Sequence, residues 1–382
     1  MKLPRLAGLV ILSATATAAL GLSQENGRKA AWPQFRHDSR HRGANGLETR
    51  LSPASVTRLQ PAWTFTTGSL VTASPAVVNG VLYVPSGDGR VYALNAVTGA
   101  LVWQSANIEA GYPSPAVGEG KVFVGTGVDI GHVYALDAAT GAVVWQTPEL
   151  GGGVTSPAYD GGRIYVGGGE SLYALDAGTG ATIWTAPVDT TFSSPAVAGG
   201  KVFVGGGPDM YAVDAATGDV LWITRTGAPG DAVWSSPAVA GGKVFVGSNA
   251  FLTPNTYALD ADTGAIDWVA YNPLAVILSS PAVANGVVYI ASNDSVFTAL
   301  DADDGAILWR TPISVYSSSP AVANGVVYAG GGFGLYVLDA TSGSILNSFG
   351  FGGAHYSSPV VVNGMVYVGS FDHKLYAFGL PR

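Results

Sequence analysis

The sequence predicts an all-β protein: an eight-bladed β-propeller of four-stranded blades, closed by pairing of the N-terminal strand with the C-terminal blade. Three observations favour this fold. The dipeptide Ser-Pro recurs eight times, at intervals of 38 to 44 residues. Each interval holds four short runs rich in Val, Tyr and Phe, separated by Gly-containing turns. The two ends of the chain supply complementary parts of one unit. A repeat of this length is typical of a four-stranded propeller blade.

The repeat unit reads as four strands in a fixed order. In the fourth unit the expected strands cover residues 194–197, 201–204, 210–214 and 219–222. Gly-Gly, Gly-rich and Thr-Gly turns separate them, and glycine supplies the positive φ that tight hairpins need. Proline at the start of the innermost strand removes no hydrogen bond from the ladder. The eight repeats begin at Ser74, Ser114, Ser156, Ser194, Ser236, Ser280, Ser319 and Ser358.

The ends of the repeat region predict how the ring closes. After Pro359 the chain supplies three strands, expected at 360–362, 365–368 and 374–378, and then stops. The missing fourth strand is expected at 61–65, because Trp63 precedes Pro75 by the same spacing that separates Trp103 from Pro115. Pairing this strand with the last three removes exposed sheet edges, so we also expect a monomer.

Composition excludes several classes of function. Charged residues make up 12% of the chain and the formal net charge is −8, with no run of Lys or Arg, which argues against nucleic-acid binding. The chain has no cysteine, which excludes disulfides, thiolate metal sites, cysteine nucleophiles and a lipid-modified cysteine.

The N-terminus has the pattern of a signal peptide, predicted over residues 1–23. Lys2 and Arg5 precede an apolar stretch, and small residues allow cleavage after Ala18 or after Ser23. The alternative is an uncleaved membrane anchor, although the stretch is short for a span. A lead-in segment (24–57) and the propeller (58–382) follow. We therefore expect an exported protein, periplasmic or extracellular.

Seven of the units carry a version of Tyr-Ala-Leu-Asp-Ala-x-Thr-Gly-x-x-x-Trp, complete at residues 134–145 and 173–184. This pattern resembles the tryptophan-docking repeat of the pyrroloquinoline-quinone-repeat family, which includes quinoprotein alcohol dehydrogenases and the propeller lipoprotein of the outer-membrane β-barrel assembly machinery. Residues 32–38, with Arg42-Gly43, are similar to the lead-in of such proteins. The resemblance implies that the repeat tryptophans are structural and pack between blades: Trp63, Trp103, Trp145, Trp184, Trp222, Trp268 and Trp309.

No catalytic residue is predicted. The resemblance implies that a dehydrogenase of this family would carry a vicinal Cys pair and a calcium site of Glu, Asn and Asp. The first is absent and the second has no match in this sequence. The repeated aspartates, such as Asp137, begin turns and are expected to accept turn N–H groups, with metal binding as the alternative. Metal binding is likewise the alternative for a group in the lead-in, His37, Asp38 and His41. We expect no metal and no cofactor; pyrroloquinoline quinone with calcium, for which Arg225 is one candidate cation, is the alternative.

One position varies where the repeat is otherwise uniform, two residues before each Ser of Ser-Pro. It places aromatic side chains near one mouth of the central channel, where they either form a binding platform or plug the channel. The candidates for ligand or partner binding are Tyr112, Phe192, Trp234, Tyr356 and the adjacent Tyr316. The predicted function is an exported, non-catalytic scaffold that holds a protein, a peptide or an envelope polymer, for example in envelope protein assembly. The alternatives are a quinone-dependent dehydrogenase or quinone-binding protein, and a carbohydrate-binding propeller.

Overall fold

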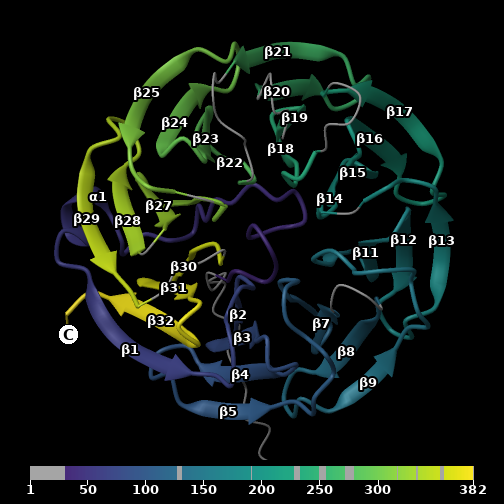
Figure 1. Cartoon of the computed structure of the whole chain (residues 1–382), viewed down its shortest axis with the longest axis horizontal. Coiled ribbons are helices and arrows are strands. Elements are labelled where there is room, and N and C mark those ends of the chain that lie inside the picture. Colours follow the sequence, from purple (N-terminus) through teal and green to yellow (C-terminus); the bar gives the residue numbers. More distant parts are fainter. Residues whose placement is uncertain are drawn as a thin grey trace, which may run out of the picture.

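Eight antiparallel sheets of four strands each stand around a central axis, which confirms the predicted eight-bladed propeller (Figure 1). The computed structural model describes residues 31–126, 131–190, 192–227, 233–248, 255–271, 279–315, 317–332, 334–352 and 357–381. The predicted signal peptide lies outside these residues. Among the described residues, no helix is both long enough and apolar enough to span a bilayer.

Each blade runs from an innermost strand beside the axis to an outer strand at the rim. The innermost strands are β2 (Ala76–Val78), β6 (Ala116–Gly118), β10 (Ala158–Asp160), β14 (Ala196–Ala198), β18 (Ala238–Ala240), β22 (Ala282–Ala284), β26 (Ala321–Ala323) and β30 (Val360–Val362). The second strands are β3 (Val81–Pro85), β7 (Lys121–Gly125), β11 (Arg163–Gly168), β15 (Lys201–Gly206), β19 (Lys243–Gly247), β23 (Val287–Ser292), β27 (Val326–Gly331) and β31 (Met365–Gly369). The third strands are β4 (Val91–Asn95), β8 (Val133–Asp137), β12 (Ser171–Asp176), β16 (Asp209–Asp214), β20 (Asn255–Asp260), β24 (Val296–Asp301), β28 (Gly334–Asp339) and β32 (Lys374–Gly379). The outer strands are β5 (Leu101–Gln104), β9 (Val143–Gln146), β13 (Thr182–Ala186), β17 (Val220–Arg225), β21 (Ile266–Tyr271), β25 (Ile307–Pro312), β29 (Ile345–Gly350) and β1 (Gln60–Thr66).

The eighth blade joins the two ends of the propeller. Its strand order is β1-β32-β31-β30, so the N-terminal strand forms the outer strand of the C-terminal blade. Trp63 lies opposite Ala377 and Thr66 opposite Lys374 in this antiparallel pair. The predicted closure is therefore confirmed, with Trp63 in the outer strand as expected from its spacing.

The repeat motif holds neighbouring blades together through its tryptophan. The indole N–H of Trp145, for example, donates to the carbonyl of Ala177 in the next blade at 3.1 Å. Its ring covers Gly180, where a Cβ atom would lie 2.6 Å from the indole and where φ is +75°. Glycine is therefore required here for two reasons: other residues rarely adopt this backbone conformation, and a side chain would overlap the indole ring. All seven repeat tryptophans donate in this way, to Ala96, Ala138, Ala177, Ala215, Ala261, Ala302 and Ala340.

The aspartate of the motif caps the turn between the third and outer strands, as predicted. The Asp137 carboxylate accepts the backbone N–H groups of Ala139 and Thr140 and the Thr140 hydroxyl. These hydrogen bonds lower the pKa of Asp137, with that of the Thr140 side chain contributing most. Asn95 accepts the same two turn N–H groups in the first blade, which explains why asparagine substitutes there.

The one unit that ends in asparagine instead of tryptophan precedes the closing blade. That blade has no covalent turn between its third and outer strands, because the two strands come from opposite ends of the chain. Asn347 instead donates to the carbonyls of Val56 and Leu59, at 3.0 and 3.3 Å. Val56 belongs to the short helix α1 (Pro53–Val56), which leads into β1. The exception in the repeat therefore marks the closure of the ring.

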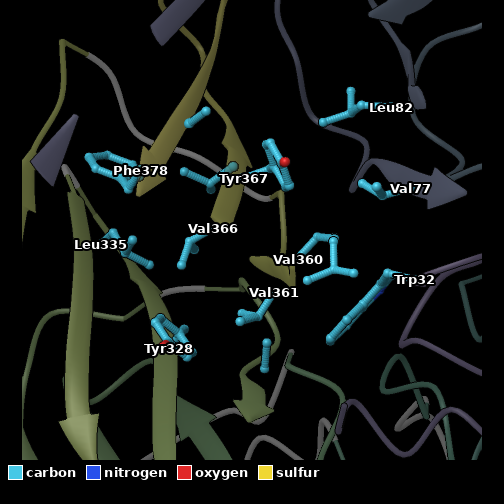
Figure 2. Close-up of a cluster of buried hydrophobic side chains, with 14 of the residues drawn as sticks. Trp32, Val77, Leu82, Tyr328, Leu335, Val360, Val361, Val366, Tyr367 and Phe378 are labelled. Carbon is cyan, nitrogen blue, oxygen red and sulfur yellow. The ribbon is translucent and has the colours of Figure 1, made fainter. Parts of the chain in front are cut away.

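Most of the core lies between blades, and its largest cluster lies at the closure (Figure 2). There the side chain of Trp32, from the lead-in, packs with Val77 of β2 and Val360 of β30. Tyr328 of β27 and Phe378 of β32 extend the cluster to the seventh and eighth blades. The lead-in is consequently part of the core that fastens the ring.

Candidate functional site

The propeller has two different faces. We call the face with the connections that lead into the innermost strands the loop face, and the opposite one, with the tight turns between first and second strands, the turn face. The aromatic residues singled out by the sequence precede the innermost strands, so they belong to the loop face. The two faces are joined by the central channel.

A closed belt of serine hydrogen bonds surrounds the channel. The backbone N–H of each Ser in a Ser-Pro pair donates to the hydroxyl oxygen of the corresponding Ser in the next blade; the N–H of Ser114, for instance, donates to Ser156 at 3.0 Å. The belt closes where Ser358 donates to Ser74 at 2.8 Å. All eight links are between 2.8 and 3.2 Å and all eight serines are buried. The belt spaces the eight loops evenly around the mouth.

The lead-in runs through the channel and contacts every blade. In Figure 1 it is the purple segment that crosses the centre of the ring. Trp32 exchanges two backbone hydrogen bonds with Val77, and Gln34 exchanges two side-chain hydrogen bonds with the backbone of Tyr159. The remaining innermost strands are also bonded through their middle residues, Val117, Val197, Val239, Val283, Val322 and Val361. Residues 32–45 thus bond at least one backbone group of each innermost strand that an open channel would expose.

Arg36 anchors the lead-in from within. Its guanidinium is buried and donates to the carbonyls of Pro281, at 2.6 Å, and Pro320. Burial lowers the pKa of Arg36 to about 9, although the nearby charge of Asp38 opposes this effect. Gly43 leaves room for the guanidinium, since a Cβ atom there would overlap it, and has φ of +63°. These contacts account for Gly43 in the lead-in pattern.

Two further ionisable groups of the lead-in have shifted pKa values. His41 is fully buried, and its ring nitrogens have no hydrogen-bond partner among the described residues. Burial, with the charge of Arg36, lowers the pKa of His41 to about 3, so the ring is neutral at pH 7. Burial also acts to raise the pKa of Asp38, but the neighbouring His37 ring and Arg42 guanidinium lower it to about 2. Arg42 contacts the Asp38 carboxylate at 2.6 Å.

Three of the five predicted aromatic residues are described, and all three are exposed. The relative exposures are 60% for Tyr112, 58% for Phe192 and 40% for Trp234. The rings of Phe192 and Trp234, from neighbouring connections, contact each other with centroids 4.9 Å apart. The lead-in runs through the channel, and these three rings remain exposed. Tyr316 and Tyr356 lie outside the described residues.

Sequence reasoning missed the serine belt and the path of the lead-in. The belt had a signal, since the Ser before Pro is identical in all eight units although a strand start does not require serine. The path of the lead-in had no such signal, because the sequence of the lead-in does not repeat although the blades that it contacts do.

The described residues do not fit a quinone with calcium. No group of three or more His, Asp or Glu side chains among them could hold a metal ion. A quinone that bears three carboxylates needs cations, but Arg36 is buried against proline carbonyls and Arg225 is paired with Asp209 at 2.9 Å. The channel wall offers serine hydroxyls, which already accept the backbone N–H groups of the belt.

Comparisons with known proteins agree with this architecture. The family model described as outer membrane protein assembly factor BamB matches residues 54–146, 129–251, 207–314 and 307–379. No curated protein sequence matches the chain. Among solved structures, the BamB of Moraxella catarrhalis is 20% identical, covers 84% of this chain and 97% of its own, and has a TM-score of 0.71.

Two other solved structures are similar in fold. The quinohemoprotein alcohol dehydrogenase of Comamonas testosteroni is 18% identical, with a TM-score of 0.76 over 93% of this chain and 81% of its own. The computationally designed protein Ika8 is 14% identical, with a TM-score of 0.69 over 84% of this chain and 99% of its own. An enzyme and a designed protein thus share this fold, so the fold alone assigns no function.

Proposed function

Because the chain belongs to the family described as outer membrane protein assembly factor BamB, we propose that it is an exported, non-catalytic scaffold that holds a polypeptide on its loop face. The observation that carries the proposal is the exposed aromatic platform of Tyr112, Phe192 and Trp234. The repeat tryptophans are nearly buried in blade contacts, whereas these rings contact solvent.

The platform has the chemistry of a polypeptide-binding surface. Aromatic side chains contribute large contact areas at a small cost in side-chain entropy, and they are enriched where proteins bind one another. The contact between Phe192 and Trp234 holds both rings in place before a partner arrives, which lowers the entropic cost of binding. The serine belt and the lead-in supply a hydrogen-bonded support beneath them.

The family description supports a role in envelope protein assembly, and the signal-peptide pattern supports export. A partner would then be a folded or unfolded polypeptide of the cell envelope. We propose no cofactor for this function, since the described residues at the channel do not fit a quinone with calcium.

Site-specific photo-crosslinking tests the proposal. Benzoylphenylalanine replaces Tyr112 or Phe192 on the platform, and in a matched control it replaces Ile183, an exposed residue on the rim strand β13. After irradiation of intact cells we expect discrete protein adducts from the platform positions, lost in the Trp234→Ala background, and none from Ile183. Adducts from the control position alone, or from no position, would contradict the proposal.

A titration with pyrroloquinoline quinone and Ca²⁺ tests the non-catalytic assignment separately. Tryptophan fluorescence and thermal stability of the purified protein are the readouts. We expect no saturable change. A calcium-dependent response at micromolar quinone would overturn this part of the proposal and would justify an assay for dye-linked dehydrogenase activity.

A further inference from the structure

Charge is distributed unequally between the two faces. None of the eight connections that enter the innermost strands contains a Lys or Arg; they are residues 67–75, 105–115, 147–157, 187–195, 226–237, 272–281, 313–320 and 351–359. Lysine and arginine begin several second strands instead, at the turn face, as in Lys121, Arg163, Lys201 and Lys243. The connections that enter the innermost strands therefore carry no Lys or Arg, whereas the turn face carries several.

Carboxylates lie in the connections that hold the aromatic platform and in the loops between them. Glu109 lies in the connection that also holds Tyr112, and Asp189 lies in the one that holds Phe192. Glu149, in the connection between those two, is exposed like the others. Glu170 adds an exposed carboxylate from the turn between β11 and β12.

Three cations near the loop face already have partners. Arg225 pairs with Asp209 at 2.9 Å, and Arg90, in the first blade, donates to the carbonyl of Ser105 at 2.8 Å. Lys374 lies 3.9 Å from the carboxylate of Asp372. The sector from Tyr112 to Trp234 consequently combines exposed rings with a surplus of exposed negative charge.

We propose that the polypeptide held on the loop face is a cationic segment, in which lysine or arginine alternates with apolar side chains. This inference rests on the proposed function and names the chemistry of its partner. Apolar side chains of the segment would contact the rings of Phe192 and Trp234, while its cations would meet Glu109, Glu149 and Glu170. Cations also favour the faces of exposed aromatic rings, so both components of the platform select the same partner.

Three short fluorescein-labelled peptides test the proposal, with Leu alternating with Lys, with Ser or with Glu. Fluorescence anisotropy measures their binding to the purified protein. We expect the Lys peptide to bind at least about tenfold more tightly than the Ser peptide, and the Glu peptide to bind most weakly. Raising NaCl from about 50 to about 300 mM should remove most of this preference.

Two triple variants with the same change in net charge distinguish a specific site from general attraction to an acidic protein. Glu109→Gln/Glu149→Gln/Glu170→Gln should weaken the Lys peptide about tenfold and leave the Ser peptide unchanged. Asp160→Asn/Asp262→Asn/Asp303→Asn, on the turn face, should change neither peptide by more than about twofold.

The possible failures are distinguishable. Equal, salt-insensitive binding of the Lys and Ser peptides, lost in Trp234→Ala, would refute the cationic partner and leave the polypeptide scaffold standing. Equal effects of the two triple variants would also refute it, because attraction would then follow net charge alone. Absence of binding by all three peptides would count against both proposals.

Discussion

At the scale of residues, a few side chains repeat one interaction around the ring. The Ser hydroxyl oxygens join adjacent blades at the channel, and the indole N–H groups join them near the rim. Each link is an ordinary hydrogen bond, but its partner lies in another blade about one repeat away. Substitution of one such residue therefore perturbs the contact between two blades rather than the fold of either.

The serine belt gives the first prediction. Ser156→Ala removes the acceptor for the buried N–H of Ser114, and an unsatisfied buried donor costs about 1–3 kcal/mol. We expect this loss in the free energy of unfolding, measured by urea denaturation, and a similar loss for Ser319→Ala. The control Thr185→Ala, on the exposed rim strand β13, should cost less than about 0.5 kcal/mol. Equal stabilities of all these proteins would exclude the belt as a stabilising feature.

The neutral, buried His41 gives the second prediction, on pH. Its pKa is about 3 in the folded protein and 6.5 in the unfolded chain, so between these values the unfolded state binds more protons. Stability therefore decreases as pH falls through this window, by about 2 kcal/mol between about pH 7 and about pH 5. His41→Leu should flatten this dependence in urea denaturation curves, whereas the control Thr185→Ala, which removes no titratable group, should not. The Asp38 carboxyl, whose pKa is lowered from 3.8 to about 2, changes stability only below about pH 5.

At the scale of elements, the lead-in acts as a common partner for all eight innermost strands. Their inward edges would otherwise present unpaired backbone groups to the channel. In the third blade the side chain of Gln34 bonds the backbone of the innermost strand, whereas in most other blades backbone groups of the lead-in do so. The lead-in thus completes the sheets of the propeller without forming a regular strand itself.

Hydrogen exchange tests this role of the lead-in. Deletion of residues 24–47 should accelerate exchange at the innermost strands, including Val117, Val197 and Val239, more than at the second and third strands, because the inner amides lose their acceptors. Mass spectrometry of peptic fragments measures the difference. Gln34→Ala in the intact chain should accelerate exchange at Tyr159 alone, which keeps the test valid if the deletion does not fold. Unchanged exchange at Tyr159 would contradict the assignment.

The elements differ in how far the sequence could predict them. Strands, turns and the position of Trp63 follow from local patterns that repeat, so spacing alone located them. The role of Asn347 could not be predicted, since its acceptors belong to a segment about 290 residues earlier that reaches it only when the ring closes. The repeat showed that Phe192 and Trp234 precede an innermost strand, but it left a binding platform and a channel plug as alternatives. Their exposure and mutual contact depend on how neighbouring loops lie in space, which the sequence does not show.

At the scale of the whole molecule, the closing blade is the one blade whose third and outer strands are not joined by a turn. In the seven other blades the third and outer strands are adjacent in sequence, whereas β1 and β32 meet across the whole propeller. Bringing the two ends together therefore carries the largest loop-closure entropy in the fold. The Trp63 ring, the Trp32 cluster and α1 with Asn347 all lie at this junction and oppose its opening.

A disulfide across the closure gives the last prediction, and the absence of other cysteines makes it unambiguous. Thr66 and Lys374 are paired across β1 and β32, as Asp209 and Arg225 are across β16 and β17 in an unbroken blade. In the chain-entropy model, Thr66→Cys/Lys374→Cys gains about 6 kcal/mol when oxidised, against about 3 kcal/mol for Asp209→Cys/Arg225→Cys, because the first bridge closes a far longer loop. Denaturation of each protein with and without reductant measures both gains. If the closure is the weakest contact of the ring, the first bridge should also slow unfolding more than the second. Equal effects on the unfolding rate would mean that the ring opens elsewhere, at a contact between blades rather than between the ends.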